Sequence, residues 1–117
     1  MNRIEQAERF FMEGFNCAQA VFCAFAPDFG FSTDVAKRLS CGLGGGVGRQ
    51  REVCGAVTGA TLVLGLRHGE DKAAVSPHVQ AFCAAFAREA GSIVCRTLQV
   101  DEPPKRLDAT DGMAVAL

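Results

Sequence analysis

The chain has 117 residues, which suits a single domain, because a chain of this length can bury one hydrophobic core but not two. Lys and Arg number 12 against 13 Asp and Glu, so the formal net charge is -1 and there is no basic block that could neutralise a row of phosphates. The composition therefore predicts a globular domain, with a core of Phe, Leu, Val and Ala, that does not bind nucleic acid.

The amino terminus and the cysteine content indicate the cellular compartment. The first residues lack the charged-then-apolar order of a secretory signal, and the longest apolar run, 56–66, is far shorter than the roughly 20 residues that span a bilayer. Six cysteines give a density below the roughly 8–10% that marks a disulfide-held mini-protein. We therefore predict a cytoplasmic protein without membrane insertion, whose cysteines do redox work or bind metal rather than cross-link the fold.

Apolar residues recur at three- and four-residue steps between Ile4 and Phe25, which is typical of an amphipathic helix. Asn16 is a good cap residue, so this stretch is either one continuous helix or two helices with Cys17 opening the second. After a turn at Pro27, Ser32 or Thr33 can cap a short helix over 34–40.

The remaining helical segments are 52–67, which reads as a buried helix, 77–90, which reads as an amphipathic one, and a last turn through 98 that Ser92 can cap. No period-two strand pattern occurs. We predict an all-α single-domain bundle of about five helices over 1–100. Pro103, Pro104 and scattered charge predict a loose tail over 101–117.

A glycine-rich segment, 41–49, lies between the second and third predicted helices. Because glycine adopts positive φ freely, such a loop can approach a ligand closely, and successive amides can form an anion-binding nest. The candidate cofactor-binding residues are therefore Gly44, Gly45, Gly46 and Gly48. The segment lacks the spacing of a P-loop or a dinucleotide fingerprint, so tight packing beside Cys54 is the simpler explanation of the glycines.

Cys54 follows Arg49 and Arg51 in the first turn of the third predicted helix, where unpaired amides and the helix dipole favour a thiolate. Cys17 and Cys95 lie at similar helix starts, after Asn16 and Ser92. No pair has Cys-x-x-Cys spacing, so any shared site must be assembled from distant segments.

For the other cysteines and the histidines, the sequence favours structural roles over chemical ones or leaves the role open. Cys23 and Cys83 lie among apolar residues and are predicted to fill the core, whereas the sequence leaves Cys41 undecided. His68 and His78 flank a turn and are predicted to be surface histidines rather than a pair of metal ligands.

Four segments carry a family resemblance: 16–21 (NCAQAV), 42–48 (GLGGGVG), 54–66 (CGAVTGATLVLGL) and 91–96 (GSIVCR). In this order they closely resemble the C_GCAxxG_C_C family of redox-active proteins. The resemblance implies that Cys17, Cys54 and Cys95 match three of the family's four characteristic cysteines. The fourth has no counterpart, because 96–117 contains no cysteine.

Three functions stay open at this point. In the first, Cys54 is a reactive thiolate, Cys17 and Cys95 are its resolving partners, and a redox partner of unknown identity exchanges disulfides or electrons with them. In the second, the protein is a module whose cysteines hold an iron-sulfur cluster or zinc, with Cys41 as a further ligand beside Cys17, Cys54 and Cys95. In the third, the chain is a structural helical homodimer with Gly59 and Gly65 on its contact face. Whether the protein is an enzyme stays open as well.

Overall fold

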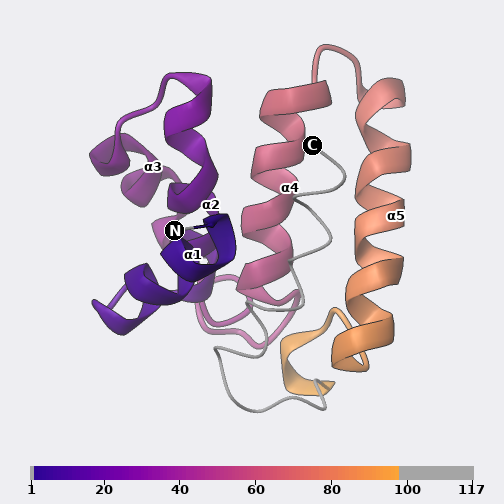
Figure 1. The fold of residues 1–117 in the computed structure, drawn as a ribbon. Coiled ribbons are helices and arrows are strands. Elements are labelled where there is room, and N and C mark those ends of the chain that lie inside the picture. The colour runs from indigo at the N-terminus through magenta and orange to yellow at the C-terminus, as the bar shows by residue number, and fades with distance from the viewer. Residues whose placement is uncertain (1, 98–117) are drawn as a thin grey trace.

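The computed structural model describes residues 2–97, which form five α-helices and three short 3₁₀ helices (Figure 1). The α-helices are α1 (Arg3–Met12), α2 (Cys17–Phe25), α3 (Thr33–Ser40), α4 (Gly55–His68) and α5 (Lys72–Ala90), and the 3₁₀ helices are η1 (Ala26–Phe29), η2 (Cys41–Leu43) and η3 (Cys95–Thr97). In Figure 1, α1 to α3 lie on one side of α4 and α5 lies on the other. The predicted all-α fold is confirmed.

Two further expectations concern the tail and the membrane. The tail predicted over 101–117 lies outside the described residues. Within residues 2–97, no helix combines the length and the apolar character that crossing a membrane requires.

The segment between Ile4 and Phe25 forms two helices, because a capping box starts the second. The Gln19 amide donates to Asn16 Oδ1 (2.9 Å), and the Asn16 amide donates to Gln19 Oε1 (2.9 Å). Both bonds satisfy amides that the first turn of a helix leaves without an intrahelical acceptor. The alternative in which Cys17 opens a second helix is therefore confirmed.

Helix α2 is the centre of the fold. Every residue from 18 to 25 is buried, and the helix packs against α1, α3 and α4. A helix that is apolar on all sides belongs in the interior of a domain. The polar exception, Gln19, is satisfied, because its Nε2 donates to the Lys37 carbonyl (3.0 Å).

Helices α2 and α4 approach closely because α4 presents glycines to α2. A Cβ on Gly59 would lie 2.7 Å from the Ala18 carbonyl oxygen, and one on Gly55 would lie 2.9 Å from the Ala18 nitrogen. Gly65, on the same helix, is exposed and would have no atom near an added Cβ. Gly59 therefore packs against α2 within the chain, so it cannot share a homodimer contact face with Gly65 as the third reading of the sequence had it. The homodimer itself stays a prediction.

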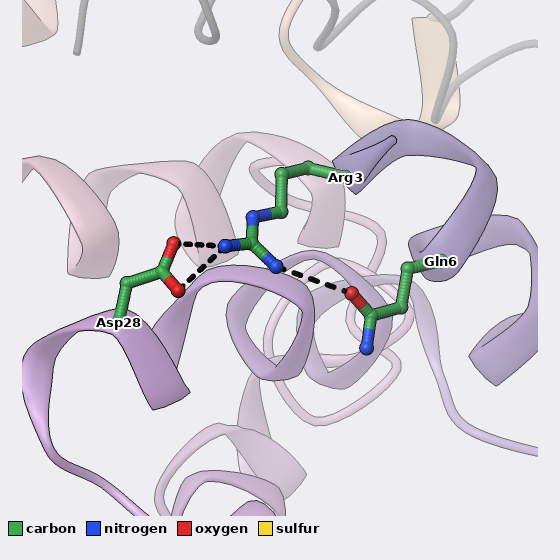
Figure 2. Close-up of polar contacts among 3 residues, drawn as sticks. All are labelled: Arg3, Gln6 and Asp28. Carbon is green, nitrogen blue, oxygen red and sulfur yellow. Dashed lines mark hydrogen bonds and ion pairs between the residues drawn. The ribbon is translucent and has the colours of Figure 1, made fainter. Parts of the chain in front are cut away.

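Helix α1 is held over the end of α2 by apolar and polar contacts. Ile4 and Ala7 are buried in the interior. Figure 2 shows the Arg3 guanidinium bridging the two carboxylate oxygens of Asp28 on η1, with its second nitrogen 3.5 Å from Gln6 Oε1. The two charged side chains are 40% and 48% exposed, so the pair contributes at most about 1 kcal/mol and the burial of Ile4 and Ala7 does more to hold the helix.

Two helix starts differ from the sequence-based prediction. Helix α4 begins at Gly55 rather than at 52, because residues 52–54 pair with the segment after α5 through the Val53–Val94 bridge. Helix α5 begins at Lys72 rather than at Pro77, because Asp71 caps it by accepting from the Ala73 amide (2.9 Å). Pro77 lies inside the helix on its exposed side, where the carbonyl left without a donor can bond to water.

The glycine-rich segment winds in the left-handed sense. Five consecutive residues, 45–49, have positive φ, and two of them, Val47 (φ 64°) and Arg49 (φ 63°), carry side chains. Left-handed backbone costs an L-residue roughly 1–2 kcal/mol, and a β-branched residue is the least suited to it. Val47 therefore stores strain in this loop.

We expect Gly59→Ala and Gly65→Ala to change stability in opposite directions. Gly59→Ala should lower the free energy of unfolding by about 1–3 kcal/mol, because its new methyl meets the backbone of α2. Gly65→Ala should raise it by about 1 kcal/mol through helix propensity alone. Urea unfolding followed by circular dichroism measures both, and equal shifts would contradict the close packing of α2 on α4.

We expect Val47→Gly to raise the free energy of unfolding by about 1 kcal/mol, because it removes the left-handed strain at a cost of some chain entropy. The matched control is Val35→Gly, since Val35 is as exposed as Val47 (43% each) but lies in helix α3. The control should lower stability by roughly 0.5 kcal/mol. A destabilised Val47→Gly protein would show that position 47 is not left-handed.

Candidate cysteine site at the start of helix α4

Cys54 is the N-cap residue of α4. The amides of Val57 and Thr58 both donate to its carbonyl oxygen (2.9 and 3.0 Å), so the helix begins immediately after it. The amino end of a helix carries amides without intrahelical acceptors and the positive end of the helix dipole. Cys54 is 1% exposed, so solvent does not screen this field at the sulfur position.

Cys95 is brought to Cys54 by backbone pairing. An isolated antiparallel bridge joins Val53 to Val94, flanked by bonds from the Cys54 amide to the Ile93 carbonyl (2.8 Å) and from the Cys95 amide to the Glu52 carbonyl (2.5 Å). Side chains alternate along extended backbone, so Cys54 and Cys95 emerge on the same face of the bridge as diagonal neighbours. Cys95 is also buried, at 7% exposure.

The guanidinium of Arg96 supports the same pairing. Its Nη1 lies 3.0 Å from Glu52 Oε1, and the Arg96 amide donates to the Arg51 carbonyl (3.2 Å). The sequence analysis did not identify this pairing. Its sequence signal is weak: β-branched residues precede both Cys54 and Cys95, in stretches too short to show a strand period.

Cys17 reaches the same region from α2. It is the first residue of that helix and is half-buried. A Cβ on Gly55 would lie 3.1 Å from the Cys17 Cβ, so the amino ends of α2 and α4 abut at these two residues. Cys17 and Cys95 therefore approach Cys54 from different elements, one from α2 and one from the segment after α5.

Cys95 was predicted to lie at a helix start capped by Ser92. Ser92 Oγ accepts from the Val94 amide (3.0 Å), and a 3₁₀ turn, η3, begins at Cys95. The bridge to 52–54, rather than this turn, sets the position of Cys95.

Metal ligation was tested against the geometry of the described chain. Across residues 2–97, no group of three or more His, Cys, Asp or Glu side chains is arranged so that it could hold a metal ion. The ligand set of Cys17, Cys54, Cys95 and Cys41 stays a prediction.

Cys41 lies at the junction of α3 and η2 and is exposed. Its carbonyl accepts from Asn16 Nδ2 (3.0 Å), which fixes it beside the start of α2. Two surface cavities, of about 490 and about 390 Å³, both have Cys41 in their walls.

Packing explains part of the glycine-rich segment. A side chain on Gly44 would collide with Asn16, and a Cβ on Gly46 would lie 2.5 Å from the Glu52 nitrogen. The amides of 47–52 all donate to carbonyls of 42–47, which leaves them unavailable to an anion. Gly44, Gly45 and Gly48 line the cavity of about 390 Å³, and their role in binding a cofactor stays a prediction.

Cys23 and Cys83 belong to the core, as predicted. Cys23 is buried, and Cys83 packs against the buried cluster. Burial raises the pKa of both thiols, with a smaller opposing effect of Lys37 on the pKa of Cys23. Both are therefore poor nucleophiles at neutral pH.

His68 and His78 are both partly exposed, and their rings stack on each other. Their rings are parallel within 4° and their centroids are 3.7 Å apart, which joins the end of α4 to α5. His68 Nε2 is buried, and the described residues offer it no hydrogen-bond partner. Desolvation, followed by the charges of His78 and Arg67, lowers the pKa of His68.

The fold is that of a small all-α protein, with a candidate cysteine site at a helix start. The family model described as "Putative redox-active protein (C_GCAxxG_C_C)" matches residues 15–114, and the chain belongs to this family. The match begins just before α2, so α1 lies outside it. Comparisons with curated proteins and with solved structures found no match.

We expect the free energy of unfolding to fall as the pH is lowered from 7 to about 5.5. The pKa of His68 is lower in the folded protein than its ordinary value of about 6.5, so the unfolded chain binds more protons below that pH. His68→Phe keeps an aromatic ring stacked on His78 but cannot titrate, so its free energy of unfolding should fall less between pH 7 and about 5.5. Urea unfolding at several pH values measures the effect, and parallel curves for the two proteins would contradict it.

Proposed function

We propose that the protein is a thiol-disulfide redox protein in which Cys54 forms a reversible disulfide with Cys17 or Cys95. The observation that carries this proposal is the approach of two cysteines from distant segments to a third that caps a helix. Membership in a redox-active family supports the same chemistry.

The reaction moves two electrons and two protons. A thiolate of the site attacks the disulfide of a redox partner, which gives a mixed disulfide and releases one partner thiolate. A second thiolate of the site then attacks the protein sulfur of the mixed disulfide and releases the second partner thiolate. The protein gains one disulfide, the partner becomes a dithiol, and the two protons lost by the site cysteines end on the partner.

Burial supports different steps for Cys17 and Cys54 in the proposed cycle. Cys54 and Cys95 are almost fully covered, whereas Cys17 is half-buried, so Cys17 is the member that a partner disulfide can approach. Cys54 then resolves the mixed disulfide from the amino end of α4, where the helix dipole favours negative charge. The proposal places this cycle in the cytoplasm, where the reducing environment returns the disulfide to thiols.

The test is disulfide mapping of the full chain. The reduced protein is oxidised with diamide, remaining thiols are blocked with iodoacetamide, and peptides are analysed by mass spectrometry. We expect a disulfide between Cys54 and Cys17 or Cys95 that dithiothreitol reverses. Cys54→Ser should abolish it, and the matched control Cys83→Ser should leave it intact, because the raised pKa of Cys83 keeps that thiol protonated.

Two results would overturn the proposal. One is oxidation that never involves Cys54. The other is an anaerobically purified protein containing stoichiometric iron or zinc that Cys54→Ser fails to retain, which would identify a metal-binding module in place of a thiol-disulfide protein.

A further inference from the structure

The two surface cavities meet at an exposed thiol that the proposed function does not use. The larger cavity, about 490 Å³, is lined by residues of α2 and α3 and by Cys41. The smaller, about 390 Å³, lies between Asn16 and the glycine-rich segment and also includes Cys41. Cys41 thus lines both cavities, and each cavity is large enough for part of a small molecule.

The charges around Cys41 favour an anion. Lys37, Arg38 and a single carboxylate, Asp34, line the larger cavity, and Arg49 lines the smaller one. The two cavities together have three cationic side chains and one anionic side chain. Lys37 is further held by the face of the Phe15 ring, 4.7 Å from its centroid, which limits its freedom to turn away.

We propose that these cavities bind a small disulfide carrying carboxylate groups and that Cys41 exchanges with it. Arg49 on one side and Arg38 and Lys37 on the other attract the carboxylates, so that the two halves of the ligand occupy the two cavities with the sulfurs at Cys41. Neither cavity is lined by Cys17, Cys54 or Cys95, and the proposal stands whether or not those cysteines form a disulfide.

The exchange is a single displacement. The Cys41 thiolate attacks one sulfur of the bound disulfide, a new bond forms between Cys41 and that sulfur, and the original sulfur-sulfur bond breaks. The other half leaves as a thiolate and takes up the proton that Cys41 lost. The product is a mixed disulfide on Cys41 and one free small thiol, and no further reductant or oxidant is needed.

Three small disulfides of different charge test the proposal on the full-length protein. They are oxidised glutathione, which is anionic, 2-hydroxyethyl disulfide, which is neutral, and cystamine, which is cationic. Adduct formation at Cys41 is followed by mass spectrometry, and each rate is divided by the rate of the same disulfide with free N-acetylcysteine amide. We expect the normalised rate to be roughly tenfold higher for oxidised glutathione than for cystamine and to fall as salt is added.

Matched arginine variants show whether the cavities cause this preference. Arg49→Gln and Arg38→Gln should each lower the rate with oxidised glutathione roughly threefold. Arg88→Gln, at an exposed position of α5 that lines neither cavity, should not change it. Cys41→Ser should lose the adduct while the Cys54 disulfide still forms on diamide oxidation. Equal normalised rates for the three disulfides, an adduct on another cysteine, or an Arg49→Gln protein that behaves like Arg88→Gln would each overturn the proposal.

Discussion

The contact between Ala18 of α2 and the start of α4 is the constraint on which the site depends. Gly55 and Gly59 lack side chains, so the backbone of α4 meets the backbone of α2 directly. A helix-helix contact of this kind leaves little room for sliding, because any shift brings carbonyls and methyl groups into collision. It therefore fixes Cys17, one residue before Ala18, against Gly55, one residue after Cys54. The same two glycines that allow the core to close also bring two cysteines of the site into one region.

Cys95 is brought near Cys54 by the hairpin that α4 and α5 form. Helix α4 has 14 residues and α5 has 19, so α5 carries the chain back along the whole of α4, roughly 28 Å against 21 Å. The chain after α5 then lies beside the residues that precede α4, and the Val53–Val94 bridge joins them. The His68–His78 stack holds the opposite end of this hairpin, so the two ends of α4 are tied to α5 and its continuation by different interactions.

Local signals in the sequence predicted the helices but not what joins them. Asn16 and Ser32 are strong caps, and the apolar period is clear, so the starts of α2 and α3 and the all-α class could be predicted. The start of α4 could not be predicted, because residues 52–54 pair with a segment about 40 residues away, and such pairing leaves only a weak local signal in the sequence. The start of α5 was missed since Pro77 appeared to begin a helix, whereas Asp71 caps it a turn and a half earlier. The candidate cysteines were found from helix starts and family motifs, but their approach to one another depends on the packing of Gly55 and on the bridge.

The cysteines differ in chemistry because the fold places one residue type in different environments. Cys23 and Cys83 lie in apolar surroundings that raise the thiol pKa, so little of either residue is present as the thiolate that reacts with oxidants or binds metals. Cys54 and Cys95 are as well covered as a core residue, yet they lie at a helix start and a bridge of only a few backbone bonds. Burial of this kind shields a thiol from stepwise oxidation to sulfinic acid. A bridge of a few hydrogen bonds also requires much less free energy to open locally than a helix does. In the proposed cycle a resolving cysteine would gain from both properties, since it would react with one sulfur on a neighbouring residue and be shielded from small oxidants between reactions.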